Sequence, residues 1–291
     1  MTSPVLTVSM PAYRAGDIMW LALEGLARQV DAPPWELLIA EEQREAFGLE
    51  AVGDYVERLE AAGCVQVQYH GLDQRVVLAR KWRQLALRSA ETSEVFCLHG
   101  ADDFSHATRL AETYQAFIDN RDDSEVPVVW VQYAKGYFAC IGHRKLAMFD
   151  YSMPGYAESK HTAVNMAAAT KFVREANDAD YATGVDGWLY GEALRVAGGR
   201  GKKVNLTEGW EGSLFTDGFN VCSLDRTTMV TELKPPFFAT DKTLFDILPE
   251  EVATRLDGLA VKALATSAER QIEKAVEVLV SAVKGLRAAS T

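Results

Sequence analysis

Strand-like and helix-like patterns alternate along the first hundred residues, and this alternation constrains the fold more than any other feature of the sequence. Four short segments predict strands: three are apolar runs of the length of a buried strand, and the third in order, residues 64–69, alternates apolar and polar residues. They cover residues 5–10, 35–40, 64–69 and 95–98. Because strands that alternate with helices build parallel sheets, the pattern predicts an α/β fold.

The segments between these runs predict helices. Residues 75–90 place Leu78, Trp82, Leu85 and Ala86 on one helical face. An earlier helix would be capped by Asp17 and carry Ile18, Leu21, Ala22 and Leu26 on one face. Residues 44–62 predict a single helix that Gly63 closes.

The second half of the chain is less regular. Residues 126–142 predict two strands joined around Lys135-Gly136, and residues 186–199 predict a helix that ends at Gly198-Gly199. From Pro249 onward the pattern is helical, with an apolar stripe on the last helix. We therefore expect a main domain over residues 1–245 and a C-terminal helical extension over residues 246–291.

Charge and cysteine content exclude some classes of protein. The formal net charge of −11 predicts no general attraction to nucleic acid or to an anionic membrane. The four cysteines lie far apart without a CxxC pair, which is typical of reduced thiols in the cytoplasm. The N-terminus lacks the pattern of a signal peptide, and no apolar run is long enough to span a membrane.

Acidic pairs follow two of the four predicted strands. The strands end in Pro11-Ala12-Tyr13, in Glu41-Glu42, in His70, and in Gly100-Ala101-Asp102-Asp103. In parallel sheets the ligand crevice lies beyond the carboxyl ends of the strands. Adjacent carboxylates repel each other unless a cation or water separates them. We therefore expect a site for a cation or for ribose hydroxyls at this edge.

The order of these motifs resembles that of the family 2-like glycosyltransferases with the GT-A fold. The resemblance rests on "VSMPAYRAG", "WELLIAEEQ", "LARKWRQLAL", "HGADDF" and "GVDGWLYGEAL", in this order, over roughly residues 4–197. It implies a Rossmann-like, mostly parallel sheet with flanking helices. It also implies an enzyme that moves a hexose or pentose from a nucleotide-sugar donor to an acceptor hydroxyl.

This chain departs from the family pattern at three places. Gly100 stands where the family has the leading acid of its Asp-x-Asp motif. Glu41 and Glu42 replace an Asp-Asp pair, and Arg14 replaces the Asn of the first motif. A degenerate protein that binds a nucleotide sugar without turnover would show similar departures.

The resemblance assigns roles to the residues at the strand ends. Asp103 would bind Mn²⁺ or Mg²⁺, and Asp102 would share the ion or bind the ribose. The alternative for Asp102 is the N-cap of the next helix. The donor would be bound by a set of strand-end residues and one helical arginine: Pro11, Ala12, Tyr13, Glu41, Arg80 and Asp102.

Asp186 is the expected catalytic base. It would take the proton of the acceptor hydroxyl in an inverting displacement, although a retaining reaction stays open. Its alternative role is the N-cap of the helix that follows. Trp188 and Trp210 are the expected acceptor contacts, because aromatic rings suit sugar faces.

Several functions fit these features. The first is a cytoplasmic, metal-assisted glycosyltransferase that acts on a small molecule, glycan or protein, either as a monomer or as a homo-oligomer. The alternatives are a phage-type transferase that acts on a hydroxymethylated pyrimidine of DNA, and the degenerate binding protein. A nucleotidyltransferase fits less well, because "PAYRAG" is poor in the glycine that a triphosphate-binding loop needs.

Overall fold

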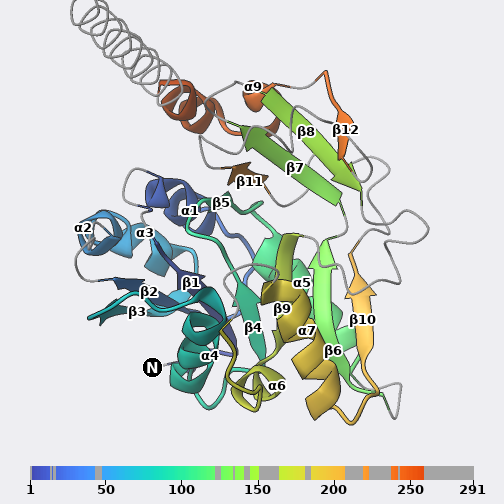
Figure 1. The fold of residues 1–291 in the computed structure, drawn as a ribbon. Coiled ribbons are helices and arrows are strands. Elements are labelled where there is room, and N and C mark those ends of the chain that lie inside the picture. Colours follow the sequence, from blue (N-terminus) through green and yellow to red (C-terminus); the bar gives the residue numbers. More distant parts are fainter. Residues whose placement is uncertain are drawn as a thin grey trace, which may run out of the picture.

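A seven-stranded sheet forms the centre of the molecule, in the order β10-β6-β9-β4-β1-β2-β3 (Figure 1). The computed structural model describes residues 2–13, 15, 18–42, 48–121, 126–133, 135–140, 145–150, 164–180, 185–206, 219–222, 237–241 and 243–258. The strands of the large sheet are β1 (Leu6–Pro11), β2 (Trp35–Glu42), β3 (Cys64–Leu72), β4 (Val95–Leu98), β6 (Val128–Tyr133), β9 (Val164–Ala169) and β10 (Lys202–Asn205).

The four strands predicted in the first hundred residues are confirmed, and all of them run parallel. β1 pairs with β2 on one side and with β4 on the other, and β2 pairs with β3. β1, β2 and β4 are almost wholly buried. This explains their continuous apolar runs, because a strand covered on both faces needs no alternation.

One strand of the large sheet runs against the others. β9 lies between β4 and β6 and is antiparallel to both. Its sequence, VNMAAA, is small and apolar and carries no clear strand signal. The sheet is therefore mostly parallel, as the sequence predicts, and β9 inserts into it through long-range pairing.

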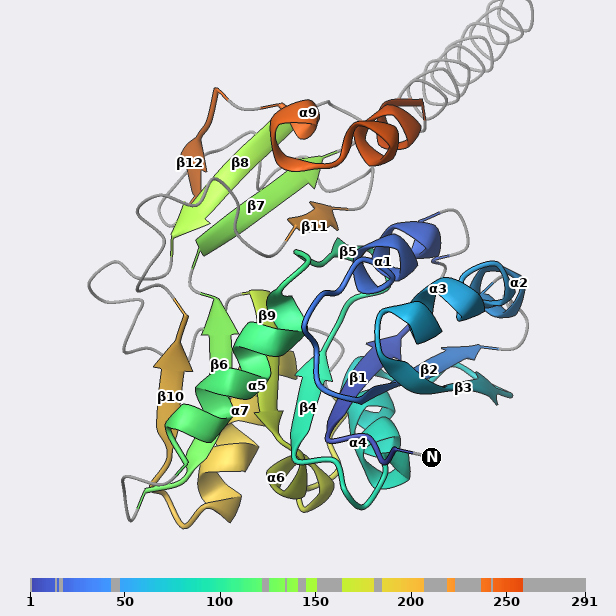
Figure 2. The same ribbon diagram turned by 180° about the vertical axis from the view of Figure 1, so that it is seen from behind.

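A second, five-stranded sheet lies over the edge at which β6 and β10 end (Figures 1 and 2). Its strands are β5 (Asp103–Phe104), β7 (Lys135–Cys140), β8 (Lys145–Asp150), β11 (Phe219–Cys222) and β12 (Phe237–Ala239). The two strands expected within residues 126–142 exist as β6 and β7, but they belong to different sheets. Asp103 begins β5 and pairs with Asn220 of β11, so the acid pair lies where the two sheets meet.

Helices flank the large sheet, with bounds that differ in part from those expected. They are α1 (Met19–Leu26), α2 (Gly48–Gly53), α3 (Val56–Ala61), α4 (Leu78–Arg88), α5 (Arg109–Asp119), α6 (Thr170–Arg174) and α7 (Val185–Val196). A further helix, α9 (Leu244–Ile247), lies beside β8 of the second sheet (Figure 1). The single helix expected over residues 44–62 is wrong, because α2 and α3 are separate. α1 is buried on every side rather than on one face. Asp17 lies outside the described residues.

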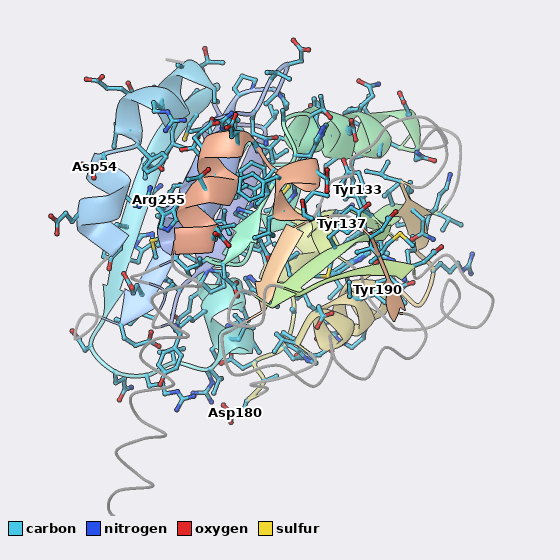
Figure 3. All side chains as sticks on the ribbon, turned by 90° about the horizontal axis from the view of Figure 1, so that it is seen from above. Asp54, Tyr133, Tyr137, Asp180, Tyr190 and Arg255 are labelled. Atoms are coloured by element: carbon cyan, nitrogen blue, oxygen red, sulfur yellow. The ribbon has the colours of Figure 1, made fainter. Side chains whose placement is uncertain are left out.

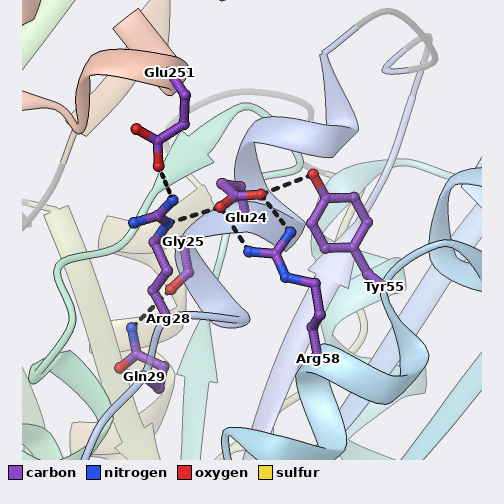
Figure 4. A network of polar contacts seen from close by, with 7 residues as sticks. All are labelled: Glu24, Gly25, Arg28, Gln29, Tyr55, Arg58 and Glu251. Atoms are coloured by element: carbon purple, nitrogen blue, oxygen red, sulfur yellow. Dashed lines mark hydrogen bonds and ion pairs between the residues drawn. The ribbon is translucent and has the colours of Figure 1, made fainter.

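A buried carboxylate joins α1 to α3 and to the C-terminal helix, which is described up to residue 258 (Figure 4). Glu24 accepts hydrogen bonds from Arg58 (2.7 and 2.8 Å), from Arg28 (2.7 Å) and from Tyr55 (3.0 Å). Arg58 and Arg28 hold the pKa of Glu24 down at about 2, although burial opposes them. Arg28 also pairs with Glu251 of the C-terminal helix.

Residues after 245 therefore pack on the main fold as far as the structure describes them. The guanidinium of Arg255 lies 3.8 Å from the ring centroid of Trp20 on α1, and Leu248, Val252 and Leu256 are buried. The apolar stripe of the last helix lies outside the described residues, and the proposed domain boundary stays a prediction.

Two further sequence expectations concern thiols and membranes. Cys64 and Cys97 are buried and free, as expected. Burial raises the pKa of the Cys64 thiol to about 12, so this group stays protonated. Within the described part of the chain, no helix has the length and apolarity needed to cross a bilayer.

Candidate functional site

The parallel strands bring the predicted site residues to one edge of the large sheet. Pro11 ends β1, Glu41 and Glu42 end β2, and Asp102 and Asp103 follow β4. Ala12 stays in register with the sheet, because its amide donates to the carbonyl of Ala40 at 2.8 Å. These residues are far apart in sequence, and the fold collects them as the strand pattern predicts.

A buried lysine links two of these strand ends. The Nζ of Lys81 on α4 donates to the carbonyl of Ala12 at 2.6 Å and pairs with Glu42 at 2.7 Å. The side chains of Lys81 and Glu42 are 3% and 8% exposed. A buried ion pair with good geometry fixes position more than it adds stability. Lys81 therefore sets the place of the backbone between Pro11 and Tyr13.

Tyr13 presents a partly exposed ring beside two cations. The ring is 41% exposed. The guanidinium of Arg75 lies 4.6 Å from its centroid, and the Nζ of Lys81 lies 5.8 Å away. A flat ring with a guanidinium nearby can stack a second flat group, which is how aromatic platforms hold bases.

Glu41 is fully buried at the end of β2. Its Oε2 accepts a hydrogen bond from the hydroxyl of Tyr69 on β3 at 2.6 Å. Burial and the nearby Glu41 raise the pKa of Tyr69, so the phenol stays a donor. Glu41 thus lies at the predicted edge, and its carboxylate is held in place by a neighbouring strand.

The acid pair converges on the backbone of Gly100. The Gly100 amide donates to Asp103 Oδ2 at 3.0 Å. A Cβ added at Gly100 would lie 2.7 Å from that oxygen and 2.9 Å from Asp102 Oδ1. Both carboxylates therefore approach the position that a Cβ on residue 100 would occupy, and only glycine, which has no Cβ, leaves room for them. The missing leading acid of the motif is thus a requirement of this geometry.

Asp103 carries a buried oxygen that is not satisfied. Its Oδ1 is shut off from solvent and has no hydrogen-bond partner among the described residues. Burial, followed by the charge of Asp102, raises the pKa of Asp103 to about 7. Such an atom is costly to bury unless a positive group compensates it. A buried carboxylate oxygen without a partner, next to a second carboxylate, fits a divalent cation.

The helix-cap alternative for Asp102 is wrong. The next helix, α5, begins at Arg109, and its N-cap is Thr108. Asp102 lies six residues earlier and is too distant along the chain to cap it. The carboxylate at position 102 therefore needs another explanation than capping.

Substitution of Gly100 should separate site geometry from folding. We expect Gly100→Ala to fold, because the atoms that it meets are the ends of two side chains that can swing away. The displaced carboxylates should weaken Mn²⁺-dependent nucleotide binding, since a shift of about 1 Å in a site can cost about 100-fold.

The check is calorimetry beside thermal unfolding. Gly53→Ala is the matched control, because no atom lies within 4 Å of its added Cβ. Unchanged Mn²⁺ dependence in Gly100→Ala would contradict this account of the acid pair.

Asp186 and Trp188 lie in the first turn of α7. The capping alternative for Asp186 is wrong, because the residue is the second of this helix rather than the one before it. A carboxylate in a first turn is still favoured by the helix dipole. Trp188 packs partly against the core. Trp210 lies outside the described residues.

Arg80 on α4 contacts Asp180, which precedes α7 in the sequence. Its guanidinium pairs with Asp180 at 2.8 Å, and both side chains are well exposed. Viewed from above, Asp180 lies at the rim of the molecule (Figure 3). Arg83, one turn along α4, pairs with Asp178 at 3.1 Å. The two ion pairs link Asp178 and Asp180 to α4. Donor binding by Arg80 stays a prediction.

Sequence reasoning missed three cations near the site. Arg75, Lys81 and Arg109 all lie within contact of predicted site residues or of their loops. Lys81 follows Leu78 by three residues, so helical spacing already placed it on the buried face of α4. Arg109 precedes Thr113 by four residues and Ala116 by seven, so helical spacing puts it on the same buried face of α5.

The donor set available for a metal is small. Within the described ranges, no three His, Cys, Asp or Glu side chains gather as a metal centre. Asp102 and Asp103 are the pair that converges. A cation bound there would need further oxygen ligands from a substrate or from water, as Mg²⁺ and Mn²⁺ often do.

The fold is that of the GT-A glycosyltransferases, which confirms the predicted fold class. The evidence is a likeness to two solved structures. S. aureus TarS 1–349 in complex with UDP-GlcNAc matches with a TM-score of 0.53 and 14% identity, over 75% of this chain and 58% of that chain. Mannosyltransferase PcManGT from Pyrobaculum calidifontis, in complex with GDP-Man and Mn²⁺, matches with a TM-score of 0.53 and 13% identity, over 98% and 81%.

The match with TarS covers only part of that protein. This chain spans less than two thirds of the TarS chain that it matches. No protein-family model matches the sequence, and no curated protein matches it.

Proposed function

We propose that this protein transfers a sugar from a nucleotide-sugar donor to an acceptor hydroxyl with the help of a divalent cation. The observation that carries the proposal is the acid pair at the end of β4. Two carboxylates converge over Gly100, and one of them has a buried oxygen that finds no hydrogen-bond partner in the described part of the chain. The position of this pair after β4 supports the proposal, because parallel sheets commonly bind ligands beyond the carboxyl ends of their strands.

Asp103 would be the main ligand of the cation, with Asp102 sharing it or binding the ribose. Bound there, Mn²⁺ or Mg²⁺ would neutralise charge on the diphosphate that leaves. The raised pKa of Asp103 supports this assignment, because a site that disfavours ionisation gains most from a nearby positive charge.

The donor would lie along the strand ends. Tyr13 offers a ring for the nucleobase, and Arg75 would cover its other face. Pro11 and Ala12 would form the floor beside it, held by Lys81. Glu41, kept in place by Tyr69, would accept a hydrogen bond from the base. Arg80 would act from α4, near the segment that precedes α7.

Asp186 would act as the base. As the acceptor oxygen attacks the anomeric carbon, the Asp186 carboxylate would take its proton, and the bond from that carbon to the diphosphate would break. This single displacement inverts the anomeric centre. Trp188 would lie against the acceptor, and Trp210 would be a second contact. The first turn of α7 supports the carboxylate form through its dipole.

Calorimetry with UDP, GDP, UDP-GlcNAc and GDP-Man tests the proposal, each with and without Mn²⁺ or Mg²⁺. We expect one nucleotide family to bind, and to bind more tightly with the metal. Absence of binding under every condition would refute the nucleotide-sugar proposal. Binding without turnover on small-molecule, glycan, protein and hydroxymethylated DNA acceptors would favour the degenerate binding protein.

A further inference from the structure

A fully buried arginine lies directly behind the acid pair. Arg109 is the first residue of α5, and its side chain is 0% exposed. Burial of a guanidinium without a partner acid is costly, because the charge loses its water. Among the described residues no carboxylate forms an ion pair with Arg109, and its Nε has no hydrogen-bond partner. A buried guanidinium without an acid partner is not needed to cap α5, whose N-cap is Thr108, or to pack it.

The guanidinium instead holds both ends of the acid-bearing loop, which we define as residues 99–105. Its Nη2 donates to the carbonyl of Leu98 at 2.8 Å, at the end of β4. Its Nη1 lies 2.8 Å from His99 Nδ1 and donates to Ser105 Oγ at 2.9 Å. One rigid fork therefore joins the start and the finish of the segment that carries Asp102 and Asp103.

The loop is also confined from the opposite side. Gly25 of α1 packs so closely that a Cβ there would lie 2.5 Å from the backbone nitrogen of Ser105. Ser105 is fully buried between this helix and the guanidinium. The acid-bearing loop thus cannot relax by a simple outward shift, and its shape depends on the contacts of Arg109.

The charge of Arg109 has Asp103 as its natural counterpart. Burial and the charge of Asp102 disfavour a negative charge on this carboxyl, whereas the hydrogen bond from the Gly100 amide and the charge of Arg109 favour it. Neither a hydrogen bond nor an ion pair joins these two described side chains, so the attraction acts at longer range through the buried interior, where it is stronger than in water. A fixed positive charge at this place eases the repulsion between two carboxylates that share one point.

We propose that Arg109 is a positioning residue for cation binding. It sets the shape of the acid-bearing loop and supplies the fixed charge that lets Asp102 and Asp103 face one point together. This inference rests on the proposed function, because it takes the acid pair as the cation site. Arg109 itself touches neither the cation nor the donor.

The test measures Mn²⁺ binding in the presence of the nucleotide that the wild type binds. The variants are Arg109→Met, which removes the charge and the donors, and Arg109→Lys, which keeps the charge and loses the fork. Ser105→Ala removes a single contact. Arg121→Met is the control, because it removes an exposed arginine, 56% exposed, just beyond the same helix. Electron paramagnetic resonance of Mn²⁺ gives both affinity and capacity.

We expect the Mn²⁺ dissociation constant to rise at least about tenfold in Arg109→Met, in line with supporting residues of metal sites. The binding capacity at saturating Mn²⁺ should stay near that of the wild type. Arg109→Lys should lie between the two, and Ser105→Ala should weaken binding by a smaller factor. A purely structural arginine would instead lower capacity in step with loss of folded protein.

The outcomes separate the two proposals. Wild-type protein without Mn²⁺-dependent nucleotide binding would remove the proposed function and this inference with it. A wild type that binds, together with Arg109→Met of equal affinity, would overturn the inference alone. If Arg109→Met does not fold, wild-type affinity in both Arg109→Lys and Ser105→Ala would overturn it.

Discussion

Asp103→Asn is expected to abolish most of the Mn²⁺ dependence of nucleotide binding, with a loss of at least about tenfold to 100-fold. Loss of a supporting residue of a metal site alone costs this much, and Asp103 is proposed as a direct ligand. Asparagine keeps the shape and can still accept the hydrogen bond from Gly100. Calorimetry with and without Mn²⁺ measures the effect, and metal-free binding should change little.

The same variant should be more stable than the wild type at high pH when no metal is present. The folded pKa of Asp103, about 7, lies above its ordinary value of 3.8, so the folded state holds the proton more tightly. The contribution of the protonated Asp103 carboxyl to the free energy of unfolding is therefore fully present below about pH 4 and is lost as the pH rises towards 7. Asparagine has no proton to lose and escapes this cost, which is of the order of a few kcal/mol.

Denaturant unfolding at pH 5 and pH 8 checks this second effect. The difference in the free energy of unfolding between variant and wild type should widen as the pH rises. It should shrink when Mn²⁺ is added, because bound metal stabilises only the wild type. Asp54→Asn is the matched control, since Asp54 is exposed at the rim of the molecule (Figure 3). Equal metal dependence in Asp103→Asn and Asp54→Asn would rule Asp103 out as a ligand.

Asp186→Asn should leave donor affinity unchanged and slow transfer by about 10²–10⁴-fold. That range is the contribution of a well-placed general base. Asparagine keeps the size of the side chain, so α7 should stay folded, but it cannot take the proton of the acceptor. A loss in kcat without a loss in donor binding separates a base from a binding residue.

The measurement compares calorimetry of the donor with the rate of sugar transfer. Asp178→Asn is a suitable control, because this exposed acid belongs to the segment before α7 and pairs with Arg83. An Asp186→Asn enzyme of wild-type rate would exclude the base role. If donor binding and the rate of sugar transfer fell together, Asp186 would have a structural role instead.

The order of elements in the first hundred residues was open to prediction because it depends on local patterns. Continuous apolar runs such as Val95–Leu98 indicate strands buried on both faces, whatever their partners. Given parallel pairing, the carboxyl ends of β1, β2 and β4 must share an edge. The gathering of Tyr13, Glu41 and Asp103 at that edge follows from sequence and sheet geometry alone.

Other features depend on contacts between distant segments, which no local pattern encodes. The small residues of β9 have no strand signal of their own, and its place comes from pairing with β4 and β6. α1 reads as amphipathic by spacing, yet other elements cover it on every side. β6 and β7 are neighbours in sequence but belong to different sheets, because the chain leaves one layer at their junction.

The site shows the same division. The sequence by itself determined the fold class and which acids lie at the strand ends, because strand periodicity and the order of elements are local properties of the chain. Helical spacing already puts Lys81 and Arg109 on buried faces, but only the tertiary structure decided that Gly100 leaves room for two carboxylates, that Lys81 binds Ala12 and Glu42, and that Arg109 binds Leu98 and Ser105. The partners of a buried charge depend on what long-range packing places around it, so they appear only once the chain is folded.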